Sequence, residues 1–254
     1  MQPSFDLMNA YFDKIYVLTL HRATERQAQI NTLLKGLNFQ FFLGVDNKTF
    51  EKNTLIEAGI YSEEKAIQLQ RYNKPMTPGQ IGCSWSHVKI YEDMMMNQYK
   101  KVLILEDDVF PITDTLPLFE KMVASLPPNW ELLYFDYDKN TTYGLTDRLK
   151  QFVYQVQSSL GFLKWSKSTI QHLYAQPYSP FLKKAGYHMY TSAYAITNKA
   201  AQTLLKEQTP IAHVADHLLA HCITNQKITG FISIPKLFGQ LSQGNIKQAN
   251  SYVD

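Results

Sequence analysis

Short, mostly apolar runs alternate along the chain with segments that carry apolar residues on one side only. The runs are rich in β-branched and aromatic residues and cover residues 14–20, 39–45, 101–105, 130–135 and 191–197. Runs of this length are typical of strands that are buried on both faces of a largely parallel sheet. A last run at 232–235 predicts a closing strand. The pattern therefore predicts an α/β fold.

A long helix is predicted over residues 77–97. It begins with a capping box, because Thr77 is followed three residues later by Gln80, and Pro78 takes the first helical position. Shorter helices are expected at about residues 21–35, 62–70 and 198–205. The rest of residues 47–75 is polar and is predicted to be irregular.

Three adjacent carboxylates, Glu106, Asp107 and Asp108, follow the most apolar of the predicted strands. The carboxyl ends of parallel strands commonly face a ligand crevice. Neighbouring carboxylates repel one another, and a hard divalent cation such as Mg²⁺ or Mn²⁺ relieves that repulsion. The stretch is therefore a candidate metal site, and the alternative is a solvated acidic turn.

The first strand and helix supply candidate contacts for a phosphate. Thr19 lies near the end of the strand, and Arg22 and Arg26 are four residues apart, which places them on one helical face. The two arginines either bind a phosphate or form a solvated basic face. There is no Gly-x-Gly-x-x-Gly fingerprint and no P-loop, so neither a dinucleotide fold of that type nor a P-loop NTPase is expected.

The helix predicted at 77–97 presents two different faces. Ile81 and Trp85 belong to an apolar face, whereas Gly82, Ser86 and Lys89 form a small and polar one. Small residues allow a close approach, either of another segment of backbone or of a flat ring in a ligand.

Residues 148–187 form a basic, aromatic-rich segment without Asp or Glu. Its cationic residues are Arg148, Lys150, Lys164, Lys167, Lys183 and Lys184, and aromatic residues are interleaved with them. This pattern is typical of a surface for anionic lipid or an anionic glycan. RNA and a plain solvated basic helix are the alternatives.

Asp216 is the one acid in an otherwise apolar and His-rich segment, residues 210–225. His213, His217 and His221 share a helical face there, but the segment lacks the His-Glu-x-x-His pattern, so zinc is not expected. The polar residues from Gln240 onward predict a flexible tail.

Composition narrows the class of protein. The chain has 254 residues, of which 45% are hydrophobic and 19% charged, and this fits one large α/β domain. Its formal net charge of +3 is too small to indicate a nucleic-acid-binding protein. Two isolated cysteines predict a reducing, cytoplasmic setting. Neither a signal peptide nor an apolar run of about 18 residues is found, so no membrane-spanning helix is expected.

Taken in order, these motifs resemble glycosyltransferase family 25, which includes bacterial lipooligosaccharide galactosyltransferases. The matching residues extend over about 14–246: Val17–Leu20 with Arg22, Glu25 and Arg26; Thr77–Cys83 with Ser86 and His87; Leu105–Asp108; Ser192–Ile196 with Ala200; Asp216; and Pro235 with Gln240. The central block, Gly-x-x-Gly-Cys-x-x-Ser-His followed by Glu-Asp-Asp, is the most specific part. Thr19 stands where the family usually has Asn, and Gln80 where it usually has Glu.

The resemblance implies a GT-A type fold: a Rossmann-like mixed sheet flanked by helices, here with a basic aromatic helical insertion. As a single domain over 1–254, it would have a nucleotide- and metal-binding half at 14–147, the insertion at 148–190, an acceptor and catalytic half at 191–246 and a flexible tail at 247–254. It also implies an inverting, metal-dependent transfer of a hexose, most often galactose from UDP-galactose, to a glycan or glycolipid such as lipooligosaccharide. Attachment to the inner face of an anionic membrane would suit the basic segment.

The resemblance also implies roles for single residues. Asp107 and Asp108 would hold Mn²⁺ or Mg²⁺, and Asp216 would be the catalytic base, with Asp136 and Asp138 as alternatives. The residues expected around the nucleotide sugar are Thr19, Arg22, Arg26, Asp46, Ser86, Lys89 and Glu106. Two other functions stay open: a metal-dependent hydrolase of nucleotide sugars or phosphoesters, and a catalytically silent glycan-binding module.

Overall fold

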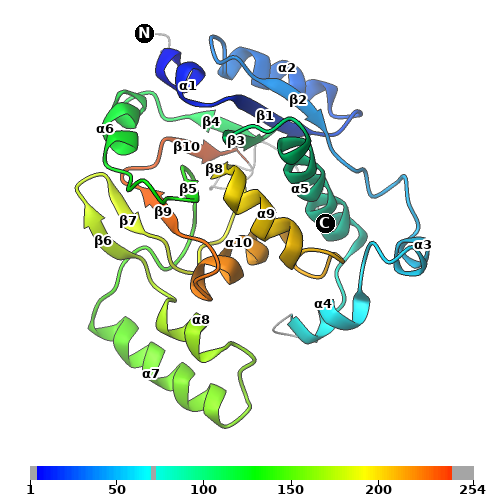
Figure 1. Ribbon diagram of the computed structural model, residues 1–254, viewed down its shortest axis with the longest axis vertical. Helices are drawn as coiled ribbons and strands as arrows, with labels where there is room; N and C mark the ends of the chain where they lie inside the picture. Colours follow the sequence, from blue (N-terminus) through cyan, green and yellow to red (C-terminus); the bar gives the residue numbers. More distant parts are fainter. Residues whose placement is uncertain (1–4, 70–72, 242–254) are drawn as a thin grey trace.

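The computed structural model describes residues 5–69 and 73–241, which form one large sheet with helices on both faces (Figure 1). Within these residues the strand order of the sheet is β2-β1-β3-β8-β5-β9-β7-β6. Its strands are β1 (Lys14–Thr19), β2 (Gln40–Leu43), β3 (Lys101–Glu106), β5 (Leu132–Tyr134), β6 (Gln176–Ser179), β7 (Leu182–Lys184), β8 (Ala193–Thr197) and β9 (Gly230–Ser233). A separate ribbon pairs β4 (Val109–Pro111) with β10 (Phe238–Gln240).

The strand directions make the sheet mixed, which confirms the predicted architecture. Strands β2, β1 and β3 are parallel, β8 runs antiparallel to both β3 and β5, and β9 is again parallel to β5. Leu18 of β1 lies opposite Glu106 of β3. The carboxyl ends of these two strands therefore lie side by side, which brings residues 19 and 107 together.

Helices cover both faces of the sheet. They are α1 (Asp6–Tyr11), α2 (Thr24–Leu33), α3 (Lys52–Glu57), α4 (Glu63–Leu69), α5 (Pro78–Met96), α6 (Phe119–Ala124), α7 (Leu145–Ser159), α8 (Lys167–Gln171), α9 (Asn198–Glu207) and α10 (Ala215–Thr224), with a short 3₁₀ helix, η1 (Leu116–Leu118). Along β3, Leu103 and Leu105 pack with α1, α2 and α6, whereas Val102 and Ile104 pack with α5, α9 and α10. Successive side chains of a strand point to opposite faces, so the apolar run of β3 serves two cores.

Helix α5 begins as the sequence predicts. The Thr77 hydroxyl accepts a hydrogen bond from the Gln80 backbone N–H at 3.2 Å, and the Gln80 side chain accepts one from Thr77 at 3.0 Å. At Gly82, a Cβ would lie 2.8 Å from the carbonyl oxygen of Val45. At Gly82 the helix is therefore approached closely by another segment of backbone and not by a ligand ring, which decides between the two alternatives at this position.

Three expectations need correction. Residues 148–190 are helical only at first, in α7 and α8; β6 and β7 then extend the central sheet, so this segment is only in part a helical insertion (Figure 1). Helix α3 lies in a stretch that was expected to be irregular, because Leu55 packs into a small core of its own. Gln240 belongs to β10 and not to a flexible tail, whereas residues 242–254 lie outside the described part of the chain.

In the described residues, no helix combines the length and the apolar character that crossing a bilayer requires.

Candidate active site

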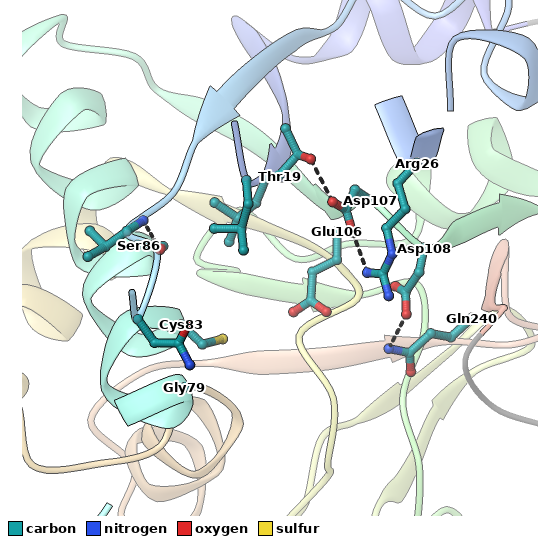
Figure 2. Close-up of a pocket in the computed structure, with 13 residues that line it drawn as sticks. Thr19, Arg26, Gly79, Cys83, Ser86, Glu106, Asp107, Asp108 and Gln240 are labelled. Atoms are coloured by element: carbon teal, nitrogen blue, oxygen red, sulfur yellow. Dashed lines mark hydrogen bonds and ion pairs between the residues drawn. The ribbon is translucent and has the colours of Figure 1, made fainter. Parts of the chain in front are cut away.

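A cavity of about 150 Å³ opens at the carboxyl ends of β1 and β3 (Figure 2). Thr19 and Glu106 come from these two strands, and Asp107 and Asp108 form the turn into β4. Figure 2 shows Gly79, Cys83 and Ser86 of α5 on one side of the cavity and Arg26 and Gln240 on the other. Segments far apart in sequence thus converge on the acidic turn.

Asp107 is held by two partners and is 5% exposed. The Thr19 hydroxyl donates to Oδ2 at 2.6 Å, and Arg26 Nη1 lies 2.7 Å from Oδ1. Burial raises the pKa of the Asp107 carboxyl, and the bonds from Thr19 and Arg26 offset this only in part. The pair of arginine and carboxylate is itself buried, so its two charges depend on each other.

Asp108 is tied to the C-terminal ribbon. Its carboxylate accepts a hydrogen bond from Gln240 Nε2 at 3.1 Å, and its backbone carbonyl accepts one from Leu241 N at 2.7 Å. The carboxyl is 5% exposed. The pairing of β4 with β10 therefore fixes the second half of the acidic turn.

Glu106 faces a buried imidazole. The Thr191 hydroxyl donates to its Oε1 at 2.5 Å, and His87 Nε2 lies 3.7 Å from the same oxygen. Burial opposes ionisation of Glu106, but His87 and Thr191 together hold the pKa of its carboxyl below the ordinary value. His87 Nδ1 is in turn 2.7 Å from the Tyr194 hydroxyl, which orients the ring.

The donor atoms in the cavity fit a divalent cation by their chemistry. Glu106, Asp107 and Asp108 offer the carboxylate oxygens that Mg²⁺ and Mn²⁺ prefer. Among the described residues, the ligand atoms that lie within 4.8 Å of one another in a group of three belong to Cys83, His87 and Glu106. Burial, with the charge of Glu106, raises the pKa of the Cys83 thiol well above its ordinary value, so that group is a poor site for a hard cation.

Asp216 lies at the start of α10, outside the lining of this cavity. Its carboxylate accepts hydrogen bonds from the backbone N–H of His217 at 2.8 Å and of Tyr190 at 3.4 Å. The next residue, His217, lines two further cavities, one of about 580 Å³. Asp216 is therefore adjacent in sequence to a residue in the wall of the larger cavity.

The larger cavity is lined by aromatic and polar side chains, among them Tyr154, Trp165, Tyr174, Tyr187 and Lys150. The rings of Trp165 and Tyr187 are 5.3 Å apart and inclined by 33°. Aromatic faces beside a few polar groups are typical of ligand cavities of this size.

The model of glycosyltransferase family 25, described as an LPS biosynthesis protein family, matches residues 12–219. The chain belongs to glycosyltransferase family 25.

Named relatives agree with this assignment. A glycosyltransferase 25 family member of Anopheles gambiae is 28% identical over 207 residues, which cover 76% of this chain and 28% of that protein. Human procollagen galactosyltransferase 2 is 25% identical over 48% of this chain and 20% of that protein. The mouse protein named inactive glycosyltransferase 25 family member 3 is 25% identical over 52% of this chain and 23% of that protein. The chain thus spans only about a quarter of the length of these relatives.

Some residues predicted to contact the nucleotide in this family 25 member have other partners. Arg22 Nε lies 2.5 Å from Asp46 Oδ2, and this pair does not line the cavity. Arg22 lowers the pKa of the Asp46 carboxyl. Lys89 extends over the ring of Trp85, 5.2 Å from its centroid. Arg22, Asp46 and Lys89 are therefore not brought into the acidic cavity, unlike Thr19, Arg26 and Glu106.

Ser86 lines the cavity, but its hydroxyl forms hydrogen bonds to backbone groups of the protein. Its Oγ accepts from the backbone N–H of Val45 at 2.8 Å and donates to the carbonyl of Gly82 at 2.7 Å. These bonds tie the segment after β2 to α5. Ser86 is therefore better placed to shape the cavity wall than to bind a nucleotide.

The two alternative bases also differ from Asp216. Asp136 is 2% exposed, accepts from the Ser192 hydroxyl at 2.6 Å and pairs with Lys236 at 2.9 Å. Such a fully engaged carboxylate is suited to holding β5 and β8 together. Asp138 forms backbone bonds with Met189.

Sequence reasoning assigned no role to His87, Thr191 and Tyr194, which form the network behind Glu106. The spacing of Cys83 and His87, one helical turn apart, was the available signal, because it places both side chains on the cavity side of α5. The contact of Thr191 with Glu106 spans 85 positions in the chain, and no local pattern carries it.

Proposed function

We propose that this protein transfers a hexosyl group, galactose in the first instance, from a UDP-sugar to a hydroxyl group of a glycan or glycolipid, with inversion at the anomeric carbon. The carrying observation is the convergence of Glu106, Asp107, Asp108 and Arg26 on one cavity at the strand ends, in a chain of glycosyltransferase family 25. A nucleoside diphosphate suits this cavity, because ligands of open α/β sheets bind at the carboxyl edge of the sheet.

In this proposal Asp107 and Asp108 hold Mn²⁺ or Mg²⁺, with Glu106 beside them. When bound, the cation would offset the negative charge that develops on the leaving diphosphate. Arg26 supplies a fixed positive charge at the same edge of the cavity, where its pair with Asp107 also sets the direction of the guanidinium.

Asp216 is proposed as the base. It takes the proton from the acceptor hydroxyl as that oxygen bonds to the anomeric carbon, and the bond from this carbon to the diphosphate oxygen breaks with its electron pair leaving on UDP. Hydrogen bonds from the backbone at residues 190 and 217 hold its carboxylate in place. The neighbouring 580 Å³ cavity, with Trp165 and Tyr187, is the proposed acceptor side, because flat rings can stack on the apolar faces of sugars.

Glycolipids such as lipooligosaccharide remain the proposed acceptor class. We place the reaction in the cytoplasm, because Cys83 and Cys222 are both free thiols.

Incubation with UDP-galactose and oligosaccharide acceptors tests the proposal. Nuclear magnetic resonance of the product should show a β-linked galactose, since inversion reverses the α configuration of the donor. Free galactose as the sole product, at a rate independent of acceptor, would instead identify a nucleotide-sugar hydrolase.

Two observations favour a second candidate, the catalytically silent glycan-binding module. Both oxygens of Asp107 already have partners in Thr19 and Arg26, and the mouse relative carries the word inactive in its name. Glycan binding without any turnover of a panel of nucleotide sugars would decide for this candidate.

A further inference from the structure

Helix α7 exposes its apolar face to solvent. The helix has no buried residue. The exposed fractions of its large apolar side chains, including the residue that ends it, are 83% for Leu145, 66% for Leu149, 62% for Phe152, 42% for Val153, 43% for Val156 and 64% for Leu160. At 3.6 residues per turn these side chains fall within an arc of about 100°. Elsewhere in the described residues, the exposed large apolar side chains are scattered over several elements.

The opposite, polar face attaches α7 to the rest of the protein. Gln151 Nε2 donates to the carbonyl of Ile170 at 2.6 Å, and the Ser158 hydroxyl donates to the carbonyl of Trp165 at 2.9 Å. The ring of Tyr154 meets that of Trp165 edge to face, at 5.7 Å between centroids. A surface helix normally packs its apolar stripe against the core, whereas α7 packs its polar face against the protein and exposes its apolar stripe. Figure 1 shows it at the periphery of the molecule, with α8 on one side.

Cationic residues border the apolar arc. By helical geometry Arg148 and Lys150 lie on opposite sides of the arc, each about 100° from its centre. Lys167 follows at the start of α8 and is exposed. The one acid in residues 145–187 is Asp147. One of its carboxylate oxygens accepts from the backbone N–H of Gly144 at 2.9 Å, and the other lies 3.9 Å from Lys150 Nζ, whose side chain stays exposed. An apolar arc between cationic borders is complementary to an anionic bilayer, whose headgroups attract Lys and Arg and whose acyl region takes up Leu and Phe.

We propose that the apolar face of α7 docks into the interface of an anionic lipid bilayer, with the helix axis parallel to the membrane. The 15-residue helix is about 22 Å long, a suitable length for lying in the interface. Charge argues against a second copy as the occupant, because a two-fold dimer through this face would bring Arg148 and Lys150 of each chain to those of the other. Lys150 and Tyr154 also line the 580 Å³ cavity, so docking brings the proposed acceptor side to the membrane.

Co-sedimentation of the purified chain with vesicles tests the proposal. Vesicles of phosphatidylcholine with and without phosphatidylglycerol are compared for wild type, for Leu149→Ser/Phe152→Ser, and for the matched control Leu7→Ser/Met96→Ser, whose side chains are 52% and 77% exposed on other helices. We expect wild type and control to bind the anionic vesicles, and the α7 variant to bind them at least about tenfold more weakly. All four side chains are exposed, so thermal unfolding should be nearly unchanged.

Two further experiments test how α7 contacts the bilayer. Arg148→Gln/Lys150→Gln/Lys167→Gln should remove the preference for phosphatidylglycerol, as should high salt. The fluorescence of a tryptophan introduced by Phe152→Trp should be quenched by brominated lipid, because the side chain enters the bilayer interface. Equal vesicle binding by wild type and Leu149→Ser/Phe152→Ser would overturn the proposal. The proposal would also be overturned if light scattering showed that wild type is a dimer and that Leu149→Ser/Phe152→Ser is a monomer, because a second copy would then cover the face. Vesicle binding needs neither donor nor acceptor, so its failure is separate from a failure of the proposed transfer.

Discussion

Replacing Arg26 with methionine should destabilise the fold strongly, because it removes the cation beside the buried carboxylate of Asp107. The two side chains are 13% and 7% exposed, and the charged atoms lie 2.7 Å apart. Two charges about 4 Å apart between their centres interact by about 4 kcal/mol at an effective dielectric constant of about 20. Breaking a buried pair from one side costs about 3–5 kcal/mol. We therefore expect a loss of about 3 kcal/mol at neutral pH, or about 6–12 °C in Tm.

The loss should depend on pH in a defined direction. Burial already raises the pKa of Asp107, and Arg26→Met raises it further. A carboxyl whose folded-state pKa lies above its unfolded-state value adds no penalty below the unfolded value. Its penalty grows as the pH rises from the unfolded-state value to the folded-state pKa, and it is constant at higher pH. The difference in the free energy of unfolding between wild type and Arg26→Met should therefore become smaller in acid, where Asp107 is protonated in both proteins.

Urea unfolding at about pH 7 and about pH 4 measures this difference. The matched control is Arg22→Met, whose pair with Asp46 is 35% and 16% exposed and should contribute about 0–1 kcal/mol. The double variant Arg26→Met/Asp107→Asn should recover most of the loss, because no buried charge remains. Equal losses for Arg26→Met and Arg22→Met, or no recovery in the double variant, would refute the reasoning.

Three more predictions follow from single contacts. Asp216→Asn should lower kcat about 10²–10⁴-fold and leave donor binding intact, as steady-state kinetics with calorimetry will show; a loss of donor affinity alone would remove Asp216 as the base. Gly82→Ala should cost about 1–3 kcal/mol in thermal unfolding, because its Cβ would lie 2.8 Å from the carbonyl of Val45; an unchanged Tm would mean that the helix can move away. Thr77→Ala should cost about 1 kcal/mol by loss of the cap, whereas Thr77→Ser should cost little; equal effects would speak against the capping hydroxyl.

The parts of the fold that sequence could predict are those set by local patterns. The strand at β3 is an unbroken apolar run, and α5 begins at a capping box, so both follow from neighbouring residues. Strands β6 and β7 carry Pro177, Lys183 and Lys184, and their apolar pattern is too weak to indicate a strand. They join the sheet because β7 pairs with β9, which lies about 50 residues later in the chain.

The candidate site divides in the same way. The position of Glu106, Asp107 and Asp108 at a strand end was predictable, because it depends on one run and one turn. Their partners were not, since Gln240 meets Asp108 across 132 positions. Arg22 and Arg26 have the same charge, but they do not share a helical face, because Arg22 lies in the turn before α2 and only Arg26 is within the helix. Arg22 pairs with Asp46 of the loop after β2, whereas Arg26 pairs with Asp107.

The most direct test of the central claim is turnover of a panel of nucleotide sugars, with and without Mn²⁺, by wild type and Asp108→Asn. Transfer from a nucleotide sugar predicts that one UDP-sugar releases UDP, faster with a glycan acceptor, only with the cation present, and far more slowly in the variant. Absence of binding to any nucleotide sugar, or identical turnover by wild type and Asp108→Asn, would contradict the assignment of this cavity as the donor site.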